Sequence, residues 1–201
     1  DNDLKISKLI KNQKTIYCFI STRKVYPSKP NLKEKSKLSP KSNYSKNKLK
    51  TEMKIVKILK NNCLILRVSN IIGDTEISKR IHNTFIDIFH KNLKKGIILD
   101  SGNAFKDFLS IDKFCEILKK IIDKRLTGTY NVSIGQKVYL NDLINWLNKF
   151  NTTKLMIKKN TNLKKESFYL NNNKLMSKVK IQNSLSELKT YCYNYSKRKF
   201  S

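Results

Sequence analysis

Glycine and proline are scarce in this sequence, with 5 and 3 residues among 201. Such low contents exclude a collagen-like or glycine-rich low-complexity chain. No run of 18 or more apolar residues occurs, so we expect no membrane-spanning helix. Residues 1–5 also lack the charged and then apolar pattern that begins a secretory signal peptide. With 39% hydrophobic residues, the chain is instead expected to bury a proper globular core.

The cysteines are few and show no C-x-x-C spacing, which argues against a zinc or redox site. Three of the four lie in apolar runs, which favours buried, reduced thiols in a cytoplasmic protein over disulfides. We therefore expect no metal site and a cytoplasmic location. The cysteines are Cys18, Cys63, Cys115 and Cys192.

Acidic residues are strongly outnumbered, because 43 Lys and Arg residues face 15 Asp and Glu residues and give a formal net charge of +28. Such a charge suits a nucleic-acid-binding protein, since Lys and Arg neutralise phosphates. The lysines are nevertheless spread along the whole chain, without an arginine-rich cluster, an aromatic RNA-binding motif or a Cys/His finger. We expect weak, nonspecific binding to polyanions at low salt, and keep specific nucleic-acid binding as a less favoured alternative.

Short apolar runs at residues 15–20 and 63–68 are typical of strands buried in a parallel sheet. Residues 27–42, which hold all three prolines, predict a loop after the first strand. A helix should follow this loop, capped by Ser42 or Asn43. We expect its buried face to be an apolar stripe of Leu49, Met53, Val56 and Leu59.

Apolar residues recur at helical spacing in the second half of the chain. They predict an α/β arrangement that continues to the last residues, with a short strand at 96–99. The predicted helices span residues 77–94, 111–124, 140–150 and 184–196.

Tyr44 and Lys48 are four residues apart in the first predicted helix, so they lie one turn apart on the same face. A neighbouring ammonium favours the phenolate form of a tyrosine, which suits an acid/base catalyst. Thr22, at the end of the preceding strand, could hold the substrate oxygen whose proton Tyr44 exchanges. A dinucleotide cofactor would then carry out the redox chemistry.

Four short motifs occur in order around and after this pair. Residues 21–26 read S-T-x-x-V-Y, and residues 66–73 read L-R-x-x-N-x-x-G. Residues 106–112 are similar to R-D-F-I-H-V-D, and residues 128–132 match G-x-Y-N-V. Together with Y-x-x-x-K, these motifs resemble those of the extended short-chain dehydrogenase/reductase family, the NAD-dependent sugar-nucleotide epimerases and dehydratases.

The resemblance implies an α/β fold, in which a Rossmann-like parallel sheet with helices on both faces lacks its N-terminal strands. A small C-terminal α/β substrate-binding part would complete it. Residues 1–75 would form the C-terminal portion of the cofactor domain with the Thr/Tyr/Lys site. Residues 76–201 would form the substrate-binding part, interleaved with the last Rossmann elements.

The resemblance also implies a role for individual residues. Tyr44 would be the general acid/base, and Lys48 would assist it and bind the nicotinamide ribose of NAD or NADP. Thr22 would orient the reacting oxygen, and Ser21 would contact the cofactor. Two further residues, Asn70 and Lys106, would place the sugar nucleotide. Lys106 replaces a family arginine, so it keeps the charge but loses the bidentate fork.

The residues after Thr22 distinguish between reactions within the family. Dehydratases of this family resemble S-T-D-E-V-Y, in which the two acids drive water elimination, whereas this chain has Arg23 and Lys24 there. Dehydration is therefore disfavoured. We expect an epimerase or 4-ketoreductase that acts on a nucleotide-activated sugar, for surface polysaccharide synthesis, and leave open whether it is a homodimer.

One family feature does not occur in these 201 residues. There is no G-x-x-G-x-x-G or G-x-G-x-x-G turn, the motif that holds a dinucleotide pyrophosphate at a helix N-terminus. The chain resembles roughly the last two thirds of a family member. It is therefore expected to be N-terminally incomplete, and either a fragment of such an enzyme or a non-catalytic remnant.

Overall fold

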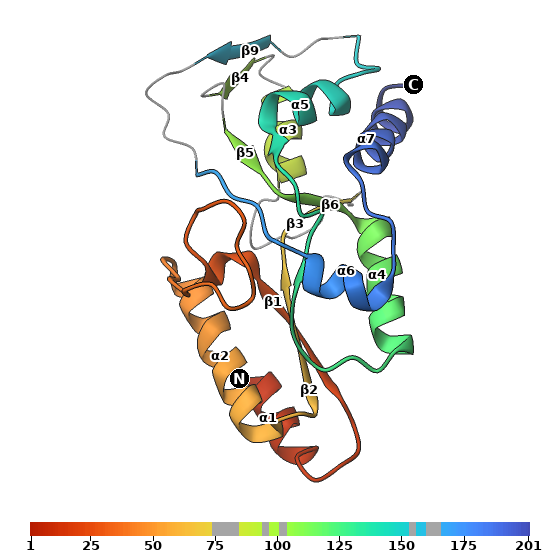
Figure 1. Ribbon diagram of the computed structural model, residues 1–201. Coiled ribbons are helices and arrows are strands. Elements are labelled where there is room, and N and C mark those ends of the chain that lie inside the picture. The colour runs from red at the N-terminus through yellow and green to blue at the C-terminus, as the bar shows by residue number, and fades with distance from the viewer. Residues whose placement is uncertain (74–84, 94–96, 101–103, 153–155, 160–165) are drawn as a thin grey trace.

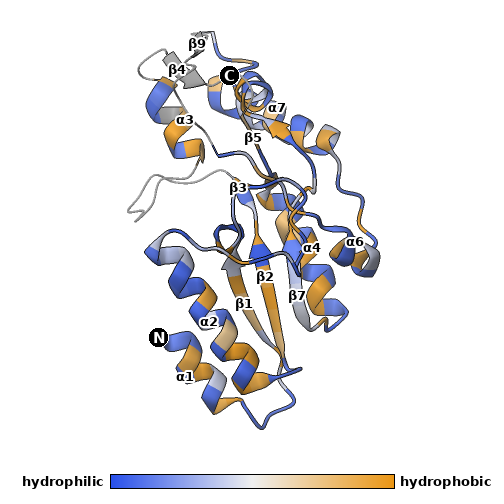
Figure 2. Cartoon of the chain, turned by 60° about the vertical axis from the view of Figure 1, so that its left-hand side comes forward, coloured by the Kyte–Doolittle hydropathy of each residue, from blue (hydrophilic) through white to orange (hydrophobic). Residues whose placement is uncertain are grey.

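A three-stranded parallel sheet is the centre of the fold. The computed structural model describes residues 1–73, 85–93, 97–100, 104–152, 156–159 and 166–201. Within them, strands β1 (Tyr17–Thr22), β2 (Cys63–Val68) and β7 (Gly128–Val132) pair in the order β1-β2-β7. Figure 1 labels β1 and β2, and Figure 2 shows all three strands side by side. Both pairings are parallel. The two predicted parallel strands are therefore confirmed. Only β2 is buried along its whole length, since Cys18 and Ile20 of β1 are exposed.

Helices cover both faces of this sheet, as Figure 2 shows. Helices α1 (Asn2–Leu9) and α2 (Asn43–Leu59) lie on one face, where Cys63 and Ile65 of β2 meet Ile55 and Leu59. Helices α4 (Ile111–Asp123) and α6 (Asn173–Val179) lie on the other face, against Leu64 and Leu66. Because successive strand residues point to opposite faces, all six residues of β2 are buried. The predicted Rossmann-like α/β fold is confirmed.

The N-terminus of α2 is fixed by its first turn. The Ser42 side chain accepts a hydrogen bond from the Ser45 backbone, and the Ser45 side chain caps Ser42 in return. Such reciprocal capping satisfies backbone N–H groups that the helix itself leaves unpaired. The predicted cap is therefore confirmed.

The predicted apolar stripe of α2 is correct at Leu59, which is buried, and wrong at Met53 and Val56. Met53 is 66% exposed and Val56 is 44% exposed, whereas polar Glu52 is buried. The buried face instead includes Ser45, Thr51, Glu52, Ile55 and Leu59. The helix is rotated so that a carboxylate faces the sheet, and only a charged partner from another element can make this favourable.

A second α/β part lies beyond the carboxyl ends of the sheet strands (Figure 1). Three strand pairs build it: β3 (Asn70–Ile72) with β6 (Phe108–Ser110), β5 (Phe105–Lys106) with β8 (Val138–Tyr139), and β4 (Ile97–Asp100) with β9 (Met156–Lys159). Its helices are α3 (Phe85–Leu93), α5 (Leu140–Leu147) and α7 (Leu185–Phe200).

The helices predicted in the second half of the chain are observed with shifted ends. For the helix predicted at 77–94, residues 77–84 and 94 lie outside the described part. Strand β7 comes after residue 76, but it pairs with β2 of the central sheet. Residues 76–201 therefore contribute to both parts of the fold. The domain boundary at residue 75 stays a prediction.

The expected burial of the thiols is only partly correct. All four cysteines are free, but Cys18 and Cys115 are exposed, while Cys63 and Cys192 are buried. Burial raises the pKa of Cys192 to about 12, so this thiol stays protonated and inert.

The loop between β1 and α2 is held by a segment far along the chain. After the 3-10 helix η1 (Arg23–Val25), the Leu32 backbone forms an isolated parallel bridge with Leu170. The Leu32 carbonyl accepts from the Asn171 N–H at 2.8 Å. A buried apolar cluster that includes Val25, Leu32 and Phe168 packs around this bridge. The long loop is therefore anchored at its centre.

Gly135→Ala is expected to lower the free energy of unfolding by about 1–3 kcal/mol. Gly135 has a φ of +78°, and an added Cβ would lie 2.5 Å from Asn172 Oδ1. The Asn172 amide cannot easily retreat, since its Nδ2 donates to the buried Ser133 carbonyl at 2.8 Å. Gly128→Ala is the matched control, because its φ is +95° and no atom lies within 4 Å of its Cβ position. Equal losses in denaturant unfolding would show that the clash contributes nothing.

Candidate active site

The residues predicted to carry the chemistry lie where β1 ends and α2 begins. Thr22 is the last residue of β1, and Tyr44 is the second residue of α2. Lys48 lies one turn further along this helix. In open parallel sheets, ligands bind beyond the carboxyl ends of the strands, which is where this group is found.

Lys48 joins the helix to the strand. Its ammonium donates to the Ile20 carbonyl at 2.9 Å and lies 4.5 Å from the centre of the Phe19 ring. Both acceptors belong to β1, and Ile20 is two residues before Thr22. The structure therefore brings Lys48 to the strand that carries Thr22.

Tyr44 and Thr22 share Lys24 as a neighbour. The Lys24 ammonium lies 5.8 Å from the centre of the Tyr44 ring, and the Lys24 backbone N–H donates to Thr22 Oγ1 at 3.3 Å. Thr22 is 9% exposed and Tyr44 is 44% exposed. A largely buried threonine and a partly exposed tyrosine therefore lie beside Lys24 of η1.

Ser21 lies in a buried network instead of on the surface of the site. Its hydroxyl donates to the Glu52 carboxylate, which also binds Arg67 through Nη2 at 2.7 Å and Nε at 3.1 Å. Arg67 Nη1 donates to the Tyr26 hydroxyl at 2.9 Å, and that hydroxyl donates to Asn131 Oδ1. Although burial alone would lower the pKa of Arg67, the Glu52 carboxylate raises it above its ordinary value.

This network was not foreseen from the sequence, but it explains the orientation of α2. Glu52 comes one turn after Lys48, and Arg67 lies on the neighbouring strand β2. Their side chains are 4% and 7% exposed. The pair therefore fixes the helix that carries Tyr44 and Lys48 against the sheet that carries Thr22.

The two predicted substrate-binding residues lie at the second α/β part. Asn70 of β3 donates through Nδ2 to the Asp107 carbonyl at 2.9 Å, and Lys106 of β5 precedes Asp107. The structure thus brings Asn70 to the chain segment that carries Lys106. Their roles toward a substrate stay predictions.

Asp107 is a further residue that sequence reasoning missed. It is fully buried and accepts hydrogen bonds from the backbone N–H groups of Ile134 and Leu170 at 3.0 Å and of Gly135 at 3.3 Å. Burial raises the pKa of this carboxyl to about 7, and the backbone hydrogen bonds oppose the rise. The sequence signal that could have indicated its burial is an acid placed directly before the apolar pair Phe108 and Leu109. Asp107 therefore connects its own segment with residues 134–135 and with residue 170.

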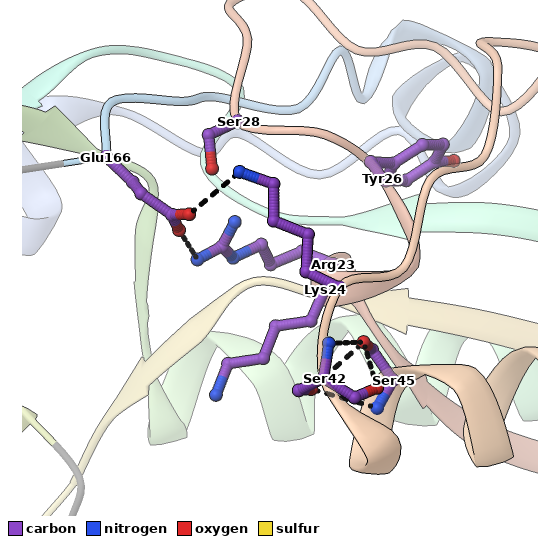
Figure 3. Close-up of a pocket in the computed structure, with 8 residues that line it drawn as sticks. Arg23, Lys24, Tyr26, Ser28, Ser42, Ser45 and Glu166 are labelled. Atoms are coloured by element: carbon purple, nitrogen blue, oxygen red, sulfur yellow. Dashed lines mark hydrogen bonds and ion pairs between the residues drawn. The ribbon is translucent and has the colours of Figure 1, made fainter.

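A cationic cavity of about 220 Å³ opens beside η1 and the start of α2 (Figure 3). Arg23, Lys24 and Lys41 contribute three positive charges to its lining, and Glu166 contributes one negative charge. The cavity adjoins Tyr44, since Lys24 contacts both.

Among the described residues, no group of three or more His, Cys, Asp or Glu side chains could hold a metal ion. In the same part of the chain, no helix has both the length and the apolar character needed to cross a bilayer.

Comparison with known proteins agrees with the fold. The model of the NAD dependent epimerase/dehydratase family matches residues 4–133. No curated protein sequence matches the chain.

Several solved structures share the fold at low sequence identity. UDP-N-acetylglucosamine 4-epimerase from Methanobrevibacter ruminantium, in complex with UDP-N-acetylmuramic acid, is 18% identical with a TM-score of 0.80, and the match covers 97% of this chain and 66% of that one. For dTDP-glucose 4,6-dehydratase from Bacillus anthracis, in complex with NAD, the identity is 18%, the TM-score 0.76 and the coverages 98% and 66%. UDP-glucuronic acid 4-epimerase from Bacillus cereus, in complex with NAD, is 20% identical with a TM-score of 0.74, and the match covers 99% of this chain and 67% of that one. The chain thus spans about two thirds of the length of these structures.

Proposed function

The chain belongs to the NAD-dependent epimerase/dehydratase family, and on this premise we propose that it is part of an NAD(P)-dependent oxidoreductase acting on a nucleotide-activated sugar. Epimerisation or 4-ketoreduction is the reaction that we favour, because Arg23 and Lys24 stand where dehydratases of the family carry acids. The observation that supports the proposal most is the bond from Lys48 to Ile20, which sets the Tyr44 helix against the end of the Thr22 strand.

The donor set at this position fits the nicotinamide ribose of a dinucleotide. An ammonium carries three donors, and Lys48 uses one of them on the Ile20 carbonyl. The others can bind the ribose hydroxyls, and the Tyr44 hydroxyl can join them. The pyrophosphate end has no matching glycine-rich turn in these 201 residues, so these residues fit one end of the cofactor only.

The protein residues would handle the proton. When bound, the dinucleotide supplies hydride transfer to or from the sugar carbon. Thr22 hydrogen-bonds the reacting sugar oxygen and holds it toward Tyr44. As the alcohol is oxidised, the Tyr44 phenolate takes the hydroxyl proton, and it returns the proton when the carbonyl is reduced. The positive charge of Lys48 stabilises the phenolate during this exchange.

Direct binding of the cofactor tests the proposal. Calorimetry with NAD(H) and NADP(H) would compare the 201-residue chain with a form extended to the start of its reading frame. We expect the extended form to bind, and Lys48→Gln to weaken binding about tenfold, because a hydrogen bond to a charged group is lost.

Lys57→Gln, on the same helix, is the charge-matched control and should bind as the unaltered protein does. Absence of binding by both forms would contradict the proposal and favour a non-catalytic remnant of the family. Surface polysaccharide synthesis and a cytoplasmic location stay predictions from the sequence, and whether the protein is a homodimer stays open.

A further inference from the structure

The cationic cavity beside Tyr44 has more positive charge than its own acid can neutralise. Three cations and one carboxylate line it, and both Arg23 and Lys41 pair with Glu166. Figure 3 shows Arg23 directed to Glu166. The two ion-pair distances are 3.6 and 3.7 Å. Both exceed the 2.7–3.2 Å of an ordinary N–H···O hydrogen bond. The single Glu166 carboxylate is therefore shared between two cations, and neither ion pair is as short as a hydrogen bond.

Arg23 is the unusual member of this group. Its side chain is 10% exposed, and its guanidinium lies 3.7 Å from the centre of the Phe168 ring. Among the described residues, its buried Nε has no hydrogen-bond partner. Burying a charged donor without an acceptor is costly. A guanidinium held in this way is preorganised for a further oxyanion with two acceptor oxygens.

The surroundings add to the positive potential. The α2 helix has 17 residues, and its N-terminus, with Ser42 and Ser45, forms part of the cavity lining. Helix N-termini attract anions through their exposed N–H groups and the helix dipole. Lys24 and Lys41 are exposed, so they can move toward a bound anion.

The position of the cavity indicates which anion it would take. Arg23 and Lys24 directly follow Thr22, and Lys24 also contacts the Tyr44 ring. A group bound here would therefore be close to the sugar carbon whose oxygen Thr22 and Tyr44 hold. The nucleotide of an activated sugar is attached at the anomeric carbon, across the ring from C4. A carboxylate on the sugar ring is thus better placed than the pyrophosphate.

We propose that this cavity binds a carboxylate of the sugar, so that the substrate is a nucleoside diphosphate sugar acid and not a neutral sugar. The inference rests on the proposed function and names the substrate class of that site. Arg23 forms the paired hydrogen bonds to the carboxylate, and Lys24 and Lys41 add charge from the open side.

Calorimetry on the extended protein, loaded with NAD, tests this assignment. The probes are UDP-glucuronate and UDP-glucose, which differ only in a carboxylate in place of a hydroxymethyl group, and the same pair carried on dTDP. We expect the acid sugar to bind at least about tenfold more tightly. Arg23→Gln should remove this preference and leave the affinity for the neutral sugar unchanged.

Because Arg23 packs on Phe168, its substitution could also disturb the fold. The double variant Lys24→Gln, Lys41→Gln changes exposed side chains only, and we expect it to reduce the preference at least about threefold. Lys57→Gln removes one charge elsewhere on α2 and should leave the preference intact.

Equal affinity for acid and neutral sugars in the unaltered protein would overturn the inference and leave the proposed function standing. An equal weakening of both ligands in Arg23→Gln and in the double variant would also overturn it, since the anion bound would then be the pyrophosphate. Binding of none of the four nucleotide sugars would instead contradict the proposed function itself.

Discussion

Tyr44→Phe is expected to lower the turnover of the complete enzyme by at least about 100-fold, the lower end of what one general acid/base contributes. The change removes a single hydroxyl from a ring that is 44% exposed, so it leaves no cavity in the core. Thr22 and Lys48 remain in place and, under the proposed function, are expected to continue to bind the ligands. The loss should therefore appear in kcat and hardly in KM.

The measurement is steady-state turnover of a nucleotide sugar by the extended protein. Tyr193→Phe, on α7 at the C-terminal end of the chain, is the matched control and should keep full activity. Cofactor binding and the unfolding transition should be unchanged in both variants. If Tyr44→Phe turns over at the rate of the control, Tyr44 is not the acid/base.

Glu52→Gln should lower the free energy of unfolding by about 3–5 kcal/mol, because it leaves the buried Arg67 guanidinium without its counter-charge. The pair is bonded through two Arg67 nitrogens, and Ser21 donates to the same carboxylate. All three residues are less than one-tenth exposed. Water therefore cannot replace the lost acceptor.

Two comparisons make this stability test decisive. Removing both charges together, in Glu52→Leu with Arg67→Met, should recover most of the loss, since a well-packed apolar pair often equals a buried ion pair. Asp123→Asn breaks the exposed Lys119–Asp123 pair and should cost less than about 1 kcal/mol. Chemical denaturation measures all four proteins. Similar losses for Glu52→Gln and Asp123→Asn would show that burial adds nothing to the internal pair.

The backbone arrangement could be predicted from the sequence because its determinants are local. Short apolar runs predicted the strands, and Ser42 indicated where α2 begins. The motifs placed Thr22, Tyr44 and Lys48 in relation to each other, and the structure sets the three side chains around the end of β1. Local pattern and family motif agree at these positions.

The rotation of α2 could not be predicted in the same way. Met53 and Val56 are about as apolar as Ile55, so the helix pattern alone permits either face to be buried. Arg67 decides which face is buried, because it pairs with Glu52. It lies 15 residues after Glu52, on strand β2. The burial of Ser21 depends on the same Glu52 carboxylate. The cavity around Arg23 depends on other distant residues, Glu166 and Phe168.

Anchoring of the Leu32 loop has a consequence for the order in which the chain folds. Leu32 binds residues near position 170, and the Asn131 side chain donates to its carbonyl from 99 positions away. Contacts between such distant residues form late, because the intervening chain must first be closed into a loop. During synthesis from the N-terminus, β1, α2 and β2 are all available long before residue 171. We therefore expect the Tyr44 region to mature only after residues 170 and 171 have been made, so a chain that stops before Leu170 would not complete its site.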